Sequence, residues 1–242
     1  MTTHYLLDHK YWVDKKHCWG RGGHLLAFNP GPHDAKLNIT LYFTDRDPIT
    51  FSRMAPAGRS SESNQSNWPI QPDVTIALVV ECSEPIICQT TTGWNNTMGE
   101  YDPPKSHTKD PHGVLRESAR SYMALTRLSQ DWYYADGIVI DNPKGIWVRE
   151  SEYALLLNPN DQPANVVLAL HYDEVVEHKI VVPPQRLKEI YMDDIAIRNK
   201  HYGVRFISDQ PIATQWIRVV QWYDRPDPMT FWSVPCVPGP LV

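Results

Sequence analysis

The sequence predicts an all-β protein built from two tandem β-sandwich (jelly-roll-like) units. Three observations support this fold class: 21 prolines occur in 242 residues, the apolar segments are short, and one residue pattern occurs twice. Proline is poorly tolerated inside helices and punctuates short strands. Hydrophobic residues make up 42% and charged residues 21% of the chain, which is typical of a globular protein, and the length allows two domains of ordinary size.

The internal repeat decides the domain organisation. The segment HLLAFNPGPHDAKLNITLYF begins at His24 and resembles YALLLNPNDQPANVVLALHY, which begins at Tyr153, 129 residues later. Other pairs keep the same order at offsets between 126 and 129, which indicates a duplication with repeats at residues 4–128 and 132–236. The pairs are Trp19 with Trp147, Asn29 with Asn158, Ala35 with Ala164, Leu41 with Leu170, Phe43 with Tyr172, Pro56 with Pro183, Arg59 with Arg186, Pro85 with Pro211, Ile86 with Ile212 and Gln89 with Gln215.

Each repeat has the pattern of short strands. Residues 36–43 alternate between apolar and polar side chains, which predicts a strand with one buried face, and residues 165–172 predict a more buried counterpart. Segments rich in β-branched and aromatic residues predict further strands at 74–82, 85–94, 203–208 and 211–222, and we expect one more from about Ser121. The tripeptides SEP at 83–85 and DQP at 209–211 predict tight hairpin connections. Such strands in units of about 100 residues favour a sandwich or a barrel.

Composition and charge exclude several classes of function. The formal net charge is −5 and no run of Lys or Arg occurs, so a nucleic-acid partner is not expected. The N-terminus does not resemble a signal peptide, and the longest apolar stretch, Val74 to Val80, is too short to cross a membrane. The four cysteines form no CxxC motif, although Cys82 and Cys88 could face each other across a hairpin. We therefore expect a cytoplasmic protein with reduced cysteines.

One set of residues occurs in both repeats. In the first repeat it comprises Asn29, Tyr42-Phe43, Asp45, Pro56-Ala57, Arg59 and the segment Pro85–Gln89; in the second it comprises Asn158, His171-Tyr172, Asp173, Pro183, Arg186 and Pro211–Gln215. With these residues each repeat resembles the Anabaena sensory rhodopsin transducer family. The resemblance implies a compact β-sandwich that assembles into symmetric oligomers. It also implies that the chain belongs to a superfamily of small-molecule-binding proteins, with sugars among the proposed ligands. Because this chain is a tandem pair rather than a single transducer domain, we do not predict photosignalling.

Two polar pairs that recur in the repeats are candidate ligand-binding residues. Gln89 and Gln215 occupy the same point of a late strand, and each amide offers the donor and the acceptor that sugar hydroxyls require. The alternative is that each amide satisfies a backbone group at the sandwich edge. Arg59 and Arg186 are candidates for binding a carboxylate or an acidic sugar, with a salt bridge at a turn as the alternative.

Aromatic residues near these glutamines suggest a surface on which a sugar ring stacks. Trp94, Trp216 and Trp222 lie on the strands that carry the glutamines, and Gln215 should face away from Trp216 and Trp222. After Trp94, residues 95–113 are polar and rich in Pro and Gly, which predicts an exposed insertion loop over a cleft with Trp94 and Tyr101 at its rim. The alternative for each Trp is packing in the core or at a subunit interface.

No catalytic motif such as GxSxG, HExxH or a Walker loop is present in the sequence. His171, Asp173 and His178 are weak candidates for a metal site, and an exposed strand is the alternative. The sequence therefore predicts no catalytic residue, metal or cofactor. It favours a non-catalytic small-molecule-binding protein that forms homo-oligomers, with a carbohydrate or related metabolite as ligand. The alternatives are an assembly protein that docks a partner, and a sugar-active enzyme using acids such as Glu150, Glu152, Asp193 or Asp194.

Overall fold

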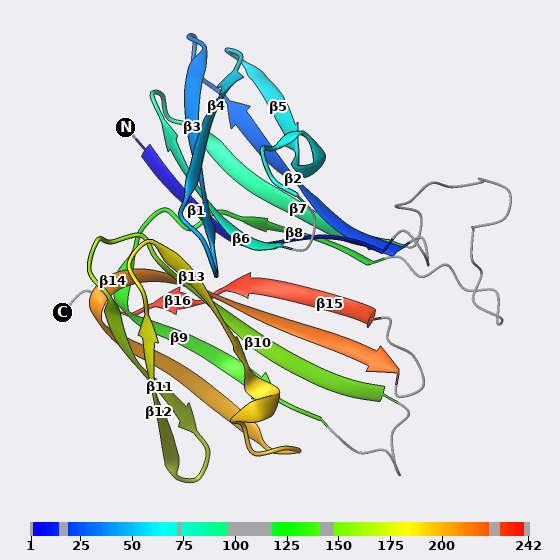
Figure 1. Cartoon of the computed structure of the whole chain (residues 1–242), viewed down its shortest axis with the longest axis vertical. Coiled ribbons are helices and arrows are strands. Elements are labelled where there is room, and N and C mark those ends of the chain that lie inside the picture. Colours follow the sequence, from blue (N-terminus) through cyan, green and yellow to red (C-terminus); the bar gives the residue numbers. More distant parts are fainter. Residues whose placement is uncertain are drawn as a thin grey trace, which may run out of the picture. The chain divides into compact units, whose positions relative to one another are not determined.

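The computed structural model describes residues 2–14, 19–71, 74–95, 118–140, 148–222 and 228–239 (Figure 1). The chain divides into two compact units, residues 1–41 with 49–126 and residues 42–48 with 127–242. The described residues are nearly all in strands, which confirms the all-β prediction. Among them, no helix is long and apolar enough to cross a membrane.

The first unit contains two connected antiparallel layers. One has the strand order β4-β3-β6-β1 and the other β5-β2-β7-β8, and the far ends of β1 and β2 pair with each other. A 3-10 turn at Gln65–Asn67 follows β5. The strands are β1 (Thr2–Asp14), β2 (Trp19–Asn29), β3 (Ala35–Phe43), β4 (Ile49–Ala55), β5 (Arg59–Asn64), β6 (Val74–Cys82), β7 (Ile87–Asn95) and β8 (Ser118–Met123).

The second unit repeats this arrangement. One layer has the order β12-β11-β14-β9, with β16 beside β9, and the other has β13-β10-β14-β15. A 3-10 turn at Met192–Asp194 follows β13. The elements are β9 (Ser129–Ile138), β10 (Val148–Asn158), β11 (Ala164–His171), β12 (Val175–Val182), β13 (Arg186–Tyr191), β14 (His201–Trp222), β15 (Pro228–Pro235) and β16 (Val237–Pro238).

The strand β14 belongs to both layers of the second unit (Figure 1). Its first part pairs with β11 and β9, and its second part pairs with β10 and β15. In the first unit β6 and β7 take these two roles as separate strands, so β6 and β7 lie in different layers. The prediction of hairpins at 83–85 and 209–211 is therefore wrong. Residues 83–85 cross from one layer to the other, because β6 and β7 do not pair with each other. Residues 209–211 lie inside the continuous strand β14.

Strand register confirms the duplication. Asn29 lies opposite Arg59, and Asn158 lies opposite Arg186. In the same way Gln89 is paired with Leu26, and Gln215 with Leu155. The predicted strand near Ser121 is also present, as β8. Alternation on β3 is as expected, since its buried face is at most 2% exposed and consists of Leu37, Ile39, Leu41 and Phe43.

A fully buried asparagine ties the two layers of each unit together. In the first unit the Asn29 amide group donates to the carbonyl of His33 at 2.8 Å and to that of Ala55 at 2.9 Å. Its Oδ1 accepts from the backbone N–H of Gly31 at 3.0 Å. Asn29 ends β2 in one layer and Ala55 ends β4 in the other. The side chain thus satisfies backbone groups that a corner between two layers would otherwise leave unpaired.

Asn158 makes the corresponding contacts in the second unit. Its amide group donates to the carbonyls of Gln162 at 2.8 Å, Val182 at 3.1 Å and Pro183 at 3.2 Å. Its Oδ1 accepts from the backbone N–H of Asn160 at 3.1 Å. The repeated Asn-Pro dipeptide is therefore the point at which each sandwich is closed.

Replacing this asparagine should destabilise the protein strongly. In Asn158→Ala the buried carbonyls lose their donor, and each unsatisfied buried group costs about 1–3 kcal/mol. We expect the free energy of unfolding to fall by about 2–4 kcal/mol, measured by urea denaturation. The control is Asn165→Ala, whose exposed side chain bonds Asp209 on the same unit and should cost less than about 1 kcal/mol. Equal losses in the two variants would contradict the assigned role of Asn158.

Candidate functional site

An open depression of about 520 Å³ lies in the second unit, where β11 ends and β14 begins. His171 is the last residue of β11 and pairs with Gly203, so the two ends lie side by side. The turn after β11 and the residues at the start of β14 provide most of the lining. The lining residues are Ala135, His171, Tyr172, Asp173, Lys200, His201, Tyr202 and Gly203.

The depression contains two tyrosines in contact with each other. The rings of Tyr172 and Tyr202 lie 5.3 Å apart between centroids. The Tyr172 hydroxyl accepts from the backbone N–H of Ile197 at 2.8 Å, which fixes that ring. Around these rings stand a cation, Lys200, and an anion, Asp173. Tyr202 is only 3% exposed, so the half-buried Tyr172 is the more accessible of the two tyrosines. The site therefore combines a partly accessible aromatic ring with a cation and an anion.

Tyr202 connects the depression to a buried carboxylate. Its hydroxyl donates to Glu152 Oε2 at 2.7 Å, and the backbone N–H of Ile138 donates to the same oxygen at 2.9 Å. The other oxygen, Oε1, accepts from Trp216 Nε1 at 3.1 Å and from Arg218 Nε at 2.7 Å. Glu152 is only 1% exposed, yet four donors surround it. A buried carboxylate is tolerated in a protein interior when it is paired and hydrogen-bonded in this way.

Arg218 extends this network towards the surface. Its Nη1 lies 3.3 Å from Asp136 Oδ2, and its Nη2 donates to the carbonyl of Asp136. Glu150 Oε2 lies 3.9 Å from the same Nη1. The Tyr134 ring stacks on Trp216 at 4.8 Å between centroids, which holds the indole that donates to Glu152.

The protonation of this network follows from its burial and its partners. Burial raises the pKa of Glu152, while the hydrogen bonds from Tyr202 and Trp216 and the charge of Arg218 oppose that rise. Burial and the adjacent Glu152 raise the pKa of Tyr202, so its hydroxyl remains a neutral donor. The pKa of Arg218 is raised by Glu152 in spite of its burial, so the guanidinium stays charged.

The first unit lacks this network. Strand pairing sets Glu152 opposite Arg218 and Ala154 opposite Trp216, whereas the equivalent pairs of the first unit are Gly23 with Thr92 and Leu25 with Thr90. A glycine and two threonines thus replace a carboxylate, a guanidinium and an indole. The buried ionic network belongs to the second repeat alone among the described residues.

The structure places the predicted polar candidates at separate positions. Gln89 is half-buried on β7 and Arg59 is exposed at the start of β5. They flank β2 at Leu26 and Asn29, so their backbones are about 14 Å apart by strand geometry. Gln215 is 1% exposed within β14. Arg186 begins β13 and donates from Nη1 to the carbonyl of Gln185 at 3.0 Å.

The aromatic candidates have mixed outcomes. Trp216 is fully buried and bonds Glu152, which is the core role weighed as its alternative. Residues 212–218 are all buried, so both faces of this part of β14 are covered, including Gln215 and Trp216. Trp94 and Trp222 lie at the ends of β7 and β14, and their side chains are outside the described part. Tyr101 and the loop of residues 96–113 lie outside the described residues as well.

The structure also places the candidate metal ligands and the candidate catalytic acids. His171 and Asp173 line the depression, but His178 pairs with Leu168, about 10 Å along β11 from His171. These three side chains do not form a metal cluster among the described residues. Of the candidate acids, Glu152 is held by four donors, and Asp193 accepts from Ser151 Oγ at 2.8 Å.

Sequence reasoning missed Lys200, His201 and Tyr202 as members of the site. A signal was present, because the dipeptide His-Tyr occurs at 171–172 and again at 201–202. Both dipeptides line the depression. Their proximity depends on the register of β11 with β14, which the one-dimensional pattern does not contain.

These features define a tandem β-sandwich protein with a polar depression and a buried ionic network in its second unit. A family model described as Anabaena sensory rhodopsin transducer matches residues 23–97 and 129–226. The chain belongs to this family. No curated protein matches.

Solved structures also resemble the chain. A structure from Thermotoga maritima, described as Thermotoga maritima 1070, has 18% identity and a TM-score of 0.40, covering 46% of this chain and 95% of that one. The Anabaena sensory rhodopsin transducer has 22% identity and a TM-score of 0.34, covering 36% and 85%. A calcium-binding mutant of Bacteroides uniformis beta-glucuronidase 2 has 8% identity and a TM-score of 0.19, covering 96% of this chain and 28% of that one.

Removing the charge of Glu152 should destabilise the second unit. In Glu152→Gln, the buried guanidinium of Arg218 loses the carboxylate to which its Nε donates. The new amide NH₂ group also faces a donor of the network where the parent has an acceptor. Breaking a buried pair from one side costs about 3–5 kcal/mol, which urea denaturation would measure. The matched control on the same strand is Glu150→Gln, whose 3.9 Å contact with Arg218 should be worth less than about 1 kcal/mol. A loss below 1 kcal/mol in Glu152→Gln would show that the network contributes little to stability.

Proposed function

We propose that this chain is a non-catalytic binding protein and that the depression of the second unit takes a small carbohydrate, a monosaccharide or a sugar acid. The observation that carries the proposal is the combination of two tyrosine rings with a lysine, an aspartate and two histidines around one depression. The half-buried ring of Tyr172, packed against the buried Tyr202, would cover the apolar side of a sugar ring, and the polar groups would satisfy its hydroxyls. A depression of about 520 Å³ is within the range of small-molecule sites.

The charges suggest which carbohydrates bind best. Lys200 and Asp173 both line the depression. An ammonium group binds a carboxylate through a charge-assisted hydrogen bond, which is roughly twice as strong as a neutral one. Asp173 accepts hydrogen bonds from sugar hydroxyls. We therefore expect a sugar acid to bind more tightly than the neutral sugar of the same configuration.

A ligand in the depression would lie close to Tyr202, which is hydrogen-bonded to the buried network. Tyr202 lines the depression and donates to Glu152, which in turn pairs with Arg218. A ligand that moves Tyr202 changes the hydrogen bonding of a buried carboxylate whose remaining donors are fixed. Such a link between a surface site and a buried ionic network is suited to a transducer-like protein, in which occupancy must alter another part of the molecule.

A ligand screen with a matched pair of variants tests this function. Glucuronate, galacturonate, glucose and galactose would be added to the full chain and the melting temperature measured, since a ligand at 100 times its Kd stabilises by about 2.7 kcal/mol. Lys200→Ala should weaken sugar-acid binding at least about tenfold, since a hydrogen bond to a charged group contributes about 1.5–3 kcal/mol. The control is Lys179→Ala, an exposed lysine on β12 outside the lining. No shift with any of the four compounds, or equal weakening in both variants, would refute the proposal.

We also propose that the chain forms homo-oligomers in the cytoplasm and that β12 is an edge through which copies associate. This strand pairs with β11 at one side and ends the layer. Two apolar side chains on it are more than half exposed, Val175 at 53% and Val181 at 55%. An edge strand has unpaired backbone groups that can pair with a strand from another copy, and a lysine on the edge disfavours such pairing. The exposed Glu177 and Lys179 lie between the two valines, so the valines near the two ends of β12 carry the proposed contact. An assembly role without a small ligand remains the alternative function, and the ligand screen separates it from binding.

The oligomer proposal predicts a change in mass on mutation. Light scattering of the parent protein should give a mass of at least two chains at micromolar concentration. Val175→Lys with Val181→Lys should shift the distribution towards the single chain, because a lysine on the edge disfavours strand addition. Lys36→Ala serves as the control, because this exposed lysine lies on β3, an inner strand of the first unit, and the variant should keep the parent mass. A parent protein that stays a single chain across the whole concentration range would contradict the proposal.

A further inference from the structure

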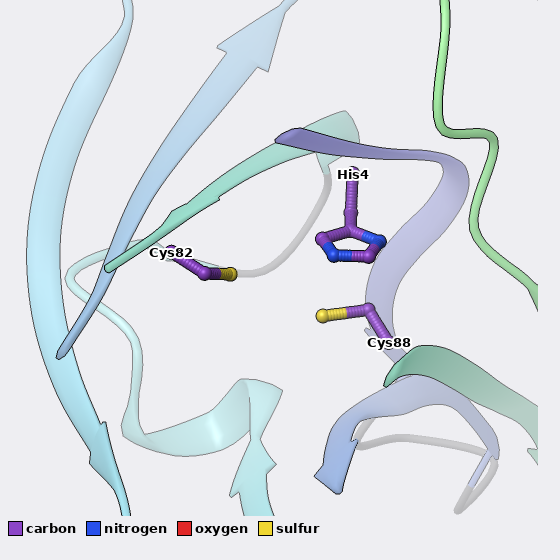
Figure 2. A group of neighbouring side chains, drawn as sticks. All are labelled: His4, Cys82 and Cys88. Carbon is purple, nitrogen blue, oxygen red and sulfur yellow. The ribbon is translucent and has the colours of Figure 1, made fainter. Parts of the chain in front are cut away.

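A buried cluster of two cysteines and one histidine lies in the first unit, remote in sequence from the depression. Figure 2 shows the His4 ring, the Cys82 sulfur and the Cys88 sulfur directed towards one common space. One nitrogen of His4 and the two sulfurs all lie within 4.8 Å of one another. All three side chains are buried, and both cysteines are free thiols.

The three residues come from both layers of the sandwich. His4 on β1 pairs with Val80 of β6, so His4 lies two pairs from Cys82 at the end of β6. Cys88 is the second residue of β7, in the other layer. The chain between the cysteines, residues 83–86, is the crossover from one layer to the other. An ion bound by all three residues would therefore link the two layers at this end of the unit.

His4 provides an independent indication of a ligand. The side chain is buried, and its Nε2 is fully enclosed without a hydrogen-bond partner. A buried polar atom with no partner costs about 1–3 kcal/mol, and such cases in native proteins point to an unplaced water or ion. A metal ion satisfies the lone pair of a neutral imidazole nitrogen without any other polar group.

The second unit shows that the sandwich does not need this cluster. The same register sets Trp132 of β9 opposite Phe206, as His4 is set opposite Val80, and repeat offsets place Ser208 and Thr214 where the cysteines stand. There the indole N–H of Trp132 donates to the carbonyl of Ile212 at 3.0 Å. Trp132 therefore occupies the position of His4 in the second repeat, whereas the first repeat has a group of soft metal-ligating side chains there.

The thiols have the chemistry that metal ligation needs. The thiolate is the form of cysteine that binds metals, so both thiols lose their protons to solvent on binding, without any redox change.

We propose that His4, Cys82 and Cys88 form a zinc site. Two thiolates balance the charge of Zn²⁺, so the bound site is neutral, which is required where all three ligands are buried. A Cys₂His set is a known ligand combination for zinc, with a fourth position open to a small ligand. Tetrahedral zinc with bonds of about 2.3 Å to sulfur holds two sulfur atoms about 3.8 Å apart. The present limit of 4.8 Å between the two sulfurs needs a contraction of about 1 Å at most.

The experiment uses the full chain, reduced and freed of metal by a chelator. Titration with Zn²⁺ followed by calorimetry should give one equivalent bound per chain and a rise in melting temperature. Cys82→Ser and Cys88→Ser should each weaken zinc binding at least about a hundredfold, since each removes one of three protein ligands. Cys236→Ser is the matched control, because Cys236 is also a buried free cysteine but lies in the second unit. It should bind zinc as the parent does.

A second measurement needs no variant and so does not depend on the mutants folding. Co²⁺ added to the parent protein should give the intense near-ultraviolet absorption of cobalt–thiolate bonds and the visible bands of a tetrahedral site, and Zn²⁺ should displace it. His4→Gln should bind Co²⁺ more weakly and change the visible bands. The proposal is overturned if the reduced parent takes up no Zn²⁺, or if Cys82→Ser and Cys88→Ser bind it as tightly as Cys236→Ser. It is equally overturned if the cobalt spectrum lacks the thiolate bands.

Discussion

The buried asparagine at the end of β2 and of β10 is the interaction on which each sandwich depends. A chain that leaves one layer and enters the other must leave backbone groups unpaired at the corner, and unpaired buried groups are costly. Asn29 and Asn158 satisfy these groups with one amide each, which joins the turn after the strand to the end of the edge strand. A backbone bond supports each corner, from Gly58 N–H to Gly31 O in one unit and from Gln185 N–H to Asn160 O in the other. This repetition of side-chain and backbone contacts shows that the duplication preserved the corner itself.

Because the corner holds the layers, the interiors of the two units were free to diverge. The second unit places Glu152, Arg218 and Trp216 where the first has Gly23, Thr92 and Thr90. Conversely, the first unit places His4 where the second has Trp132. Among its described residues, each unit thus has a cluster of ionisable groups that its counterpart replaces with side chains that do not ionise. A buried charge, or a buried imidazole nitrogen without a hydrogen-bond partner, costs stability, so the rest of the unit must supply enough stability for such clusters to persist. The two clusters are therefore the strongest candidates for functional sites, because folding of a unit does not require them.

The sequence predicts the layers better than it predicts the site. The alternation on residues 36–43 and the equivalence of Asn29 and Asn158 can be read from local sequence patterns, and both predictions are confirmed. The hairpin prediction at 83–85 failed because a turn tripeptide does not reveal whether the next strand returns to the same layer. The spacing of Trp216 and the neighbouring Gln215 did not predict that Trp216 donates to the buried Glu152. Both faces of this part of β14 are buried, so alternation along the strand does not distinguish a ligand-binding face. Lys200 and Tyr202 were missed because their meeting with His171 is set by the pairing of distant strands. Glu152 was seen as a possible acid but not as the partner of Arg218, for the same reason.

We propose that a ligand bound in the second-unit depression alters the buried network through Tyr202. Nitrogen-15 NMR of the parent chain during titration with glucuronate measures this directly, because the indole N–H of Trp216 donates to the same carboxylate as Tyr202. We expect the backbone signals of Lys200 and Tyr202 to shift together with the Trp216 indole signal, at one common apparent Kd, while the signals of β2 to β7 stay in place. Shifts confined to the first unit, or shifts at Lys200 with an unchanged Trp216 indole signal at saturation, would contradict it.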